Sequence, residues 1–256
     1  MEKCLVTKLQ GIVNNKSLRK LDELIIDYKA GAATDYSKQK VYINSSLGSP
    51  AIRMIGSKLV DTSGNDAQST LGNNYVSNFD CHIYIDKREL LSDLSFDGER
   101  FAFNLSELLY CKNMANFTGS NSSGVNGDIS CFKGTTKIKR ISLYGDTNVR
   151  GDISVLANYD IEQLILHSCP NITGTLDSLL NSTSLFDVQL VGTQISGNVN
   201  EFLTNLAKKK KSGNLRFFSG WNEGLEYNGS HFDSITFKFS DSGWVEQNEH
   251  SHRSRV

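Results

Sequence analysis

A glycine recurs at an almost constant interval through the middle of the chain. Gly127, Gly151, Gly174 and Gly197 follow one another at intervals of 24, 23 and 23 residues. An aliphatic residue stands two positions before and two positions after each of the last three glycines. Four glycines at so regular a spacing are hard to obtain by chance, so the sequence predicts that one structural unit is repeated.

Each of the last three glycines also follows three aliphatic residues at offsets 0, +3 and +5. The groups are Ile138/Ile141/Leu143, Ile161/Leu164/Leu166 and Leu185/Val188/Leu190. This L-x-x-L-x-L spacing with a period of 23 or 24 residues resembles a leucine-rich repeat, in the form found in plant and some bacterial repeats. We expect each triplet to point inward from a short strand, and the glycine to permit a tight turn behind it. Because no unit buries its apolar face alone, the units should stack.

The repeat divides the chain into four predicted parts, within a mainly β (α+β) fold. Residues 1–100 form a small N-terminal β domain, 101–213 a short leucine-rich-repeat solenoid, 214–245 capping strands and 246–256 a polar tail. The alternative is a β-rich domain in which the spacing is accidental.

Several finer expectations concern the borders of the array. The segment 87–96, "KRELLSDLSF", predicts a short helix leading into the repeats. Leu105, Leu108 and Tyr110 have the triplet offsets and predict an upstream repeat strand, followed by a loop insertion over 112–126. Apolar residues at helical spacing predict a longer helix over 201–211, and "NLRFF" and "SITFKF" predict the capping strands.

Composition argues against two classes of partner. The formal net charge is −1, with 27 basic and 28 acidic residues, so we expect no nucleic-acid partner. The cluster Lys208–Lys211 is predicted to be the solvated C-terminal end of a helix. No stretch approaches the roughly 18 apolar residues of a membrane span.

The start "MEKCLVTKLQG" lacks the apolar core of a signal peptide, which predicts that the protein is made in a cytoplasm.

No catalytic, metal or cofactor motif stands out. The chain has no phosphate-binding loop, nucleophile elbow or paired zinc-binding histidines. The five cysteines are scattered and are predicted to be mostly buried free thiols. Glu162 and Asp187 are the closest candidates for a carboxylate pair, but the repeat alignment makes them only diagonal neighbours. We therefore expect no enzyme activity, no cofactor and no metal, and keep a glycan-active enzyme as the least favoured alternative.

The residues between the leucines predict a binding face. In a leucine-rich repeat they line the concave side, and their mixture of aromatic, aliphatic and charged side chains suits a protein or glycan partner. Ile165, Phe186 and Val191 are expected to form an exposed apolar patch. The predicted face comprises Lys139, Arg140, Ser142, Tyr144, Glu162, Gln163, Ile165, His167, Phe186, Asp187, Gln189 and Val191.

The beginning of the chain suggests where such a face would act. "MEKCLVTKLQGIVNNKSL" and the following "LDELIID" resemble a start shared by short proteins of Bacteroidota and their phages, including crAss-like phages. This resemblance covers about the first 28 residues. It implies a virion protein, of a tail or fibre, whose common N-terminus docks while the variable C-terminal modules face outward.

We therefore expect a phage structural or adhesion protein located in the virion. Its partners would be other virion proteins, a host cell-surface protein or a glycan, and it could form homo-oligomers. The alternative is a bacterial or prophage-encoded interaction module that stays in the cytoplasm.

Overall fold

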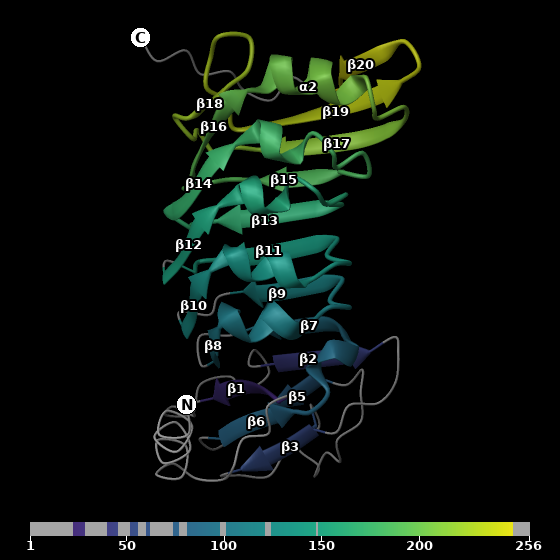
Figure 1. Ribbon diagram of the computed structural model, residues 1–256. Helices are drawn as coiled ribbons and strands as arrows, with labels where there is room; N and C mark the ends of the chain where they lie inside the picture. The colour runs from purple at the N-terminus through teal and green to yellow at the C-terminus, as the bar shows by residue number, and fades with distance from the viewer. Residues whose placement is uncertain are drawn as a thin grey trace, which may run out of the picture.

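The protein is mainly β and is built from two large mixed sheets (Figure 1). The computed structural model describes residues 23–28, 40–45, 52–55, 60–61, 74–76, 81–97, 101–120, 124–146 and 148–247.

The smaller sheet has nine strands. In spatial order they are β18 (Leu225–Glu226), β16 (Gln194–Asn198), β14 (Asn171–Thr175), β12 (Asn148–Asp152), β10 (Gly124–Asp128), β8 (Phe101–Asn104), β1 (Leu24–Tyr28), β6 (Cys81–Ile85) and β3 (Ile52–Ile55). The larger sheet has eleven strands. They are β20 (Gly243–Glu246), β19 (Ser234–Ser240), β17 (Gly213–Phe218), β15 (Asp187–Gln189), β13 (Gln163–His167), β11 (Arg140–Tyr144), β9 (Asn116–Ser120), β7 (Leu91–Asp97), β2 (Lys40–Ser45), β5 (Asn74–Val76) and β4 (Val60–Asp61).

From β7 to β18 the chain alternates between the two sheets. A strand of the larger sheet is followed by a strand of the smaller sheet and, in most cases, by a short helix, and we call this combination a unit. Corresponding strands of successive units pair in parallel. The helices form one column along the molecule (Figure 1): η3 (Leu105–Tyr110), η4 (Ile129–Gly134), η5 (Ile153–Leu156), η6 (Leu176–Leu179) and α2 (Val199–Ala207).

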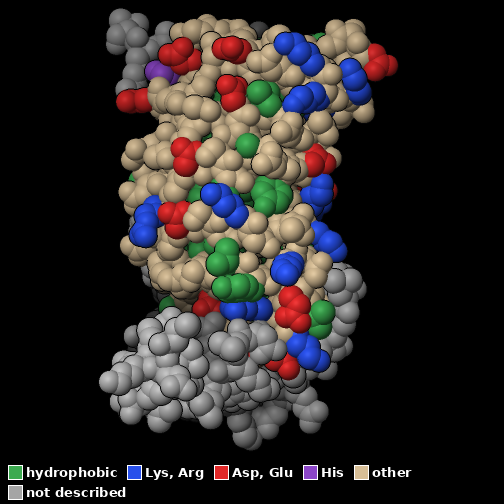
Figure 2. Space-filling model, viewed as in Figure 1, with side chains coloured by type: hydrophobic (Ala, Val, Ile, Leu, Met, Phe, Trp, Pro, Cys, Tyr) green, Lys and Arg blue, Asp and Glu red, His purple; other side chains and the backbone are tan. Residues whose placement is uncertain are grey.

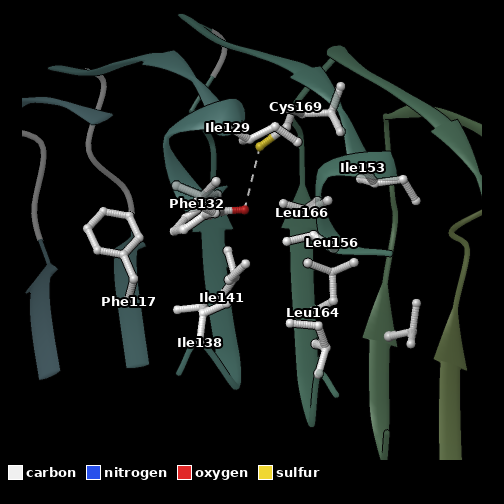
Figure 3. Packing of buried hydrophobic residues seen from close by; sticks show 14 of the residues in the cluster. Phe117, Ile129, Phe132, Ile138, Ile141, Ile153, Leu156, Leu164, Leu166 and Cys169 are labelled. Carbon is white, nitrogen blue, oxygen red and sulfur yellow. Dashed lines mark hydrogen bonds between the residues drawn. The ribbon is translucent and has the colours of Figure 1, made fainter. Parts of the chain in front are cut away.

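The predicted triplets form the core between these layers. In strands β11, β13 and β15 the +3 residues are Ile141, Leu164 and Val188, which are directly paired in register. All nine triplet residues are at most 1% exposed, and the aliphatic residues that flank each glycine are also buried. Figure 3 shows part of this core, with Ile138 and Ile141 of one unit beside Leu164 and Leu166 of the next. The inward orientation of the triplets is thus confirmed.

Three predictions at the start of the array are wrong. The segment 87–96 contains only a three-residue 3-10 helix, η2 (Arg88–Leu90), before strand β7 begins. Leu105, Leu108 and Tyr110 belong to the helix η3, not to a strand. The supposed loop insertion contains strand β9, whose pairing with both β7 and β11 is regular.

The units that begin with strands β7 and β9 do not follow the aliphatic pattern, because aromatic residues fill part of their core. Strand β7 buries Phe96 at the third triplet position, and β9 has Gly119 at that position. A Cβ on Gly119 would lie 3.2 Å from the Phe96 ring, so a larger residue would push the ring away. The ring of Phe96 lies 5.1 Å from that of Phe103 and 5.6 Å from that of Phe117, and these side chains fill the core where other units use isoleucine, leucine or valine.

The recurring glycines allow adjacent units to approach closely. Gly174 has φ +119, and a Cβ there would lie 2.8 Å from both Asp152 Oδ1 and Ile153 Cγ1. Asp152 is the N-cap of η5, and its side chain accepts a hydrogen bond from the backbone amide of Ser154. Capping by a short polar side chain satisfies an amide that the helix leaves free. Gly174 therefore packs against the capped helix start of the unit before it. Gly197 packs in the same way against Leu176, the first residue of η6, which has no side-chain cap.

The downstream strands agree with the prediction, but the helix is shorter than predicted, because α2 ends at Ala207 and not at residue 211. Helix α2 buries Phe202, Leu203 and Leu206, and strands β17 and β19 lie at the expected positions. Strands β19 and β20 pair antiparallel and end the larger sheet. The lysine cluster follows α2 and does not form its last turn, contrary to the prediction. Lys210 is also not solvated: it is only 5% exposed, and its ammonium group donates to the carbonyl of Leu185.

At the other end, strands before residue 86 extend both sheets. Strand β1 pairs with β8, and β2 pairs with β7, both antiparallel. Leu24, Ile26 and Ile43 belong to the same buried cluster as the repeated triplets. The proposed border at residue 100 remains a prediction. Residues 1–22, which carry most of the N-terminal resemblance, and the tail from 248 lie outside the described residues.

Candidate functional site

The predicted binding residues lie on or beside the outer face of the larger sheet. Arg140, Ser142 and Tyr144 alternate with buried residues on β11 and therefore point away from the core. On β13 the corresponding residues are Gln163, Ile165 and His167. Lys139, Glu162 and Phe186 precede the strands, Asp187 and Gln189 lie on β15, and Val191 follows it.

Charged groups on this face are paired across strands. Arg140 donates from Nε to Glu162 Oε2 at 3.0 Å. Arg216 holds Asp187 through two hydrogen bonds of 2.9 Å each, and Gln163 Nε2 donates to the same carboxylate at 3.0 Å. The Asp187 side chain is only 5% exposed and fixes its neighbours in place. The polar groups of this row are held in one arrangement before any partner arrives.

Glu162 and Asp187 do not form an acid–base pair of the kind considered from the sequence. Register pairs Asp187 with Gln163, as the repeat alignment predicted. Each carboxylate is instead held by an arginine from a different strand. The absence of enzyme activity remains a prediction.

Aromatic rings form a strip at the ends of β11 and β13. The rings of Tyr144 and His167 stack with centroids 4.4 Å apart and planes inclined by 19°. The ring of Phe218, on β17, is 6.5 Å from that of His167. Tyr144 is 42% exposed, and His167 Nδ1 is 2.8 Å from the hydroxyl of Ser168. Desolvation lowers the pKa of His167, so its imidazole is neutral at pH 7.

The expected apolar patch is not continuous. Phe186 is 40% exposed and lies below the guanidinium of Arg140, whose Cζ is 5.6 Å from the ring centroid. Ile165 and Val191 are half-buried. Phe186 precedes strand β15 and Val191 follows it, so the strand itself separates them. Phe186 is therefore an isolated aromatic contact, separate from the strip of Tyr144, His167 and Phe218.

A depression of about 280 Å³ lies on the same face, and we call it the trough. Its floor includes Ser95, Thr118 and Ser142, which are directly paired on β7, β9 and β11. The trough is lined by Tyr42, Asp93, Leu94, Ser95, Asn116, Thr118, Arg140, Ser142 and Gln163.

A second depression, of about 610 Å³, lies on the outer face of the smaller sheet. It is lined by Asp128, Asn148, Arg150, Gly151, Asn171, Thr173 and Gln194. Arg150 and Asp128 form an exposed pair there at 3.8 Å. No aromatic side chain lines it, in contrast to the trough.

The helix column offers a different kind of surface. Figure 2 shows acidic and basic side chains interspersed over the described part of one face, with hydrophobic side chains between them. Leu109 and Tyr110 of η3 are 42% and 54% exposed. Arg88 covers the Tyr110 ring, with Cζ 4.4 Å from its centroid.

The cysteine expectation is met for the three cysteines whose state the structure describes. Cys111, Cys131 and Cys169 are free and buried. Burial raises the pKa of each of these thiols to about 12, which keeps them protonated and unreactive at neutral pH. Among the described residues, no three His, Cys, Asp or Glu side chains gather into a possible metal site.

One buried carboxyl is unusual for its lack of partners. Asp146 is fully buried, and within the described part of the chain neither carboxyl oxygen has a hydrogen-bond partner. Burial raises its pKa to about 8. The corresponding residues of the next two units are Cys169 and Thr193, which donate to the carbonyls of Leu143 and Leu190.

Asp146→Thr is therefore expected to stabilise the protein at pH 8 by about 1–3 kcal/mol, the usual penalty of an unsatisfied buried polar group. A carboxyl with a raised pKa in the folded state contributes stability below its unfolded pKa and loses it as pH rises through about 8. Urea unfolding at pH 5.5 and pH 8 should show a wild-type loss of stability that the variant lacks. An equal pH dependence in both proteins would contradict this role for Asp146.

Sequence reasoning missed part of the face. Tyr42, Ser95, Thr118 and Phe218 were not among the predicted binding residues, although they point the same way. A search that accepted aromatic residues at triplet positions would have found Leu91/Leu94/Phe96 and, one interval later, Met114/Phe117. The outward residues of β7 and β9 would then have followed from the alignment.

The comparisons do not assign the chain to a family. No family model, curated protein or solved structure matches it. Of the helices that the structure describes, none is both long and apolar enough to cross a membrane.

Proposed function

We propose that the chain is a binding protein of a phage virion. In this proposal its N-terminal part docks to the particle, and the outer face of the larger sheet contacts a partner subunit or a host-surface ligand. The repeated units act as leucine-rich repeats, which present one surface residue pattern on successive parallel strands.

The observation that carries the proposal is the construction of the outer face. Polar side chains such as Gln163 and Asp187 are held by hydrogen bonds across strands, while Tyr144 and Phe186 remain exposed between them. Aromatic residues in a preorganised polar surrounding are typical of binding surfaces, because little side-chain freedom is lost on contact.

The virion assignment has a separate support. It rests on the resemblance of the first 28 residues to a start shared by phage and Bacteroidota proteins. Mass spectrometry of purified virions from the encoding phage tests it, with peptide counts scaled to the major capsid protein. A fixed low copy number is expected, whereas peptides found only in infected-cell lysate would favour the cytoplasmic interaction module.

Phe186→Ala is expected to weaken binding while changing the free energy of unfolding by less than about 1 kcal/mol, since the side chain is 40% exposed. Retention on purified particles and on host cell envelopes measures the first effect, and urea unfolding the second. A variant that loses stability but binds normally would show that Phe186 serves the core and not the face.

A further inference from the structure

We propose that the trough and the adjoining aromatic strip bind a neutral oligosaccharide. This inference rests on the proposed function, because it names the ligand class of the same face. It adds residues that the sequence did not assign to binding, above all Tyr42, Ser95 and Thr118.

The floor of the trough presents hydroxyl groups at regular intervals. Ser95, Thr118 and Ser142 are paired in register, so adjacent hydroxyls stand about 4.8 Å apart, the separation of neighbouring strands. Within the described residues these three hydroxyls make no hydrogen bond to another protein group. Each is therefore available both to donate and to accept, which matches the hydroxyl groups of a sugar chain.

Longer polar side chains border the hydroxyl row. Asn116 donates from Nδ2 to Asp93 Oδ1, and Gln163 donates to Asp187. These contacts hold in place the amide groups of Asn116 and Gln163 and the carboxylate of Asp93, and all three residues line the trough. A ligand with many alternating donors and acceptors can satisfy them without a large change in the protein.

The shape of the site favours an extended ligand. The row of residues paired from Tyr42 through Ser95, Thr118 and Ser142 to Ile165 crosses five strands. Four strand separations amount to roughly 19 Å. An extended oligosaccharide fits this length better than a single sugar.

The aromatic strip supplies a stacking surface next to the trough. Tyr144 follows Ser142 by two residues on β11 and therefore lies on the same face. Its ring is stacked on His167 and is 42% exposed, so one ring is presented in a fixed orientation. The apolar C–H face of a sugar ring can pack on such a surface, as other apolar groups pack on aromatic rings.

The charges of the face favour a neutral ligand. Arg140 is held by Glu162, so the guanidinium at the edge of the trough is already neutralised. The carboxylate of Asp93 lies within the trough and would repel an anionic sugar. The stacked imidazole of His167 is neutral because burial lowers its pKa. A polar ligand without charge meets no repulsion from any of these groups.

Isothermal titration calorimetry of the full-length protein tests the inference. The probes are neutral hexasaccharides, namely cello-, xylo-, manno-, malto- and chitohexaose, with oligogalacturonate and hyaluronan fragments as acidic probes. We expect at least one neutral probe to bind, with an affinity that changes less than about twofold between 50 and 500 mM NaCl, because no ion pair with the ligand is screened.

Variants locate the site. Tyr144→Ala should weaken binding about five- to tenfold, and Tyr144→Phe by no more than about twofold, since the stacking ring is retained. Thr118→Val, which removes a trough hydroxyl at constant shape, should weaken it about three- to tenfold. Tyr110→Ala is the matched control, because Tyr110 is an exposed tyrosine on the helix column and should leave binding unchanged.

Three outcomes would overturn the inference. Binding of acidic probes alone would reject a neutral ligand. Neutral binding that survives both Tyr144→Ala and Thr118→Val would place the sugar elsewhere. If no probe binds, yet Tyr144 and Phe186 become protected from oxidation in virions, the face binds a protein; the oligosaccharide is then rejected while the proposed function stands.

Discussion

Leu166→Ala is expected to lower the free energy of unfolding by about 2–5 kcal/mol, the usual cost of truncating a fully buried leucine. Leu166 is 1% exposed and ends the triplet of strand β13, with units packed on both sides. The cavity would therefore open in the middle of the continuous core, where neighbouring units cannot both move in to fill it (Figure 3).

Urea unfolding followed by circular dichroism measures this loss. Ile165→Ala is the matched control, because Ile165 is the preceding residue and points to the opposite, outer face of β13. It is half-buried, so we expect a clearly smaller effect. A larger loss for Ile165→Ala would show that the inward and outward positions of the strand are assigned the wrong way round.

Gly174→Ala is expected to destabilise the protein by about 2–5 kcal/mol. Part of this loss, about 1–3 kcal/mol, comes from a left-handed backbone that alanine adopts unwillingly, since φ is +119. The remainder comes from overpacking, because the new Cβ would lie 2.8 Å from Asp152 Oδ1 and Ile153 Cγ1.

Gly145→Ala separates the two causes. Gly145 also has a positive φ, of +76, but no heavy atom lies within 4 Å of where a Cβ would stand. Gly145→Ala should therefore show only the loss caused by the left-handed backbone. We expect it to lower the free energy of unfolding by less than Gly174→Ala does, as measured by thermal and urea unfolding of both variants. Equal losses at the two positions would mean that close packing between units does not explain the recurring glycine.

The sequence carried enough information to find the units in which leucine, isoleucine and valine fill the core. Ile138, Leu164 and Val188 are buried at the predicted offsets because aliphatic side chains of similar size repeat there. The period also located the recurring glycines, whose positive φ only glycine adopts easily. They lie within strands β12, β14 and β16, however, and not in the tight turns that the sequence predicted.

The units that begin with β7 and β9 were harder to predict, because their core contains aromatic residues at positions that are aliphatic in later units. Phe96 and Phe117 take the place of aliphatic residues, and the small Gly119 makes room for the Phe96 ring. Leu105 and Leu108 reproduced the triplet offsets by coincidence, since a 3-10 helix also places residues three apart on one side. Spacing alone did not distinguish these two structures.

The candidate site was predictable only in part. The alternation of strands β11 and β13 placed Arg140, Tyr144 and Gln163 on one face. The trough depends on β2, β7 and β9, which come together through pairing between distant segments. Strand β2 pairs with β7 across about fifty residues of sequence, and no local pattern encodes that contact.

The most direct test of the account is hydroxyl-radical footprinting of the chain, free in solution and bound to virions or to host cell envelopes. Oxidation of Tyr144, His167 and Phe186 reports on the outer face of the larger sheet, and oxidation of Leu109 and Tyr110 reports on the helix column. We predict that Tyr144 and Phe186 become protected in a bound state while Tyr110 reacts as before. Protection of Leu109 and Tyr110 with no change at Tyr144 and Phe186 would contradict the account and assign binding to the helix column.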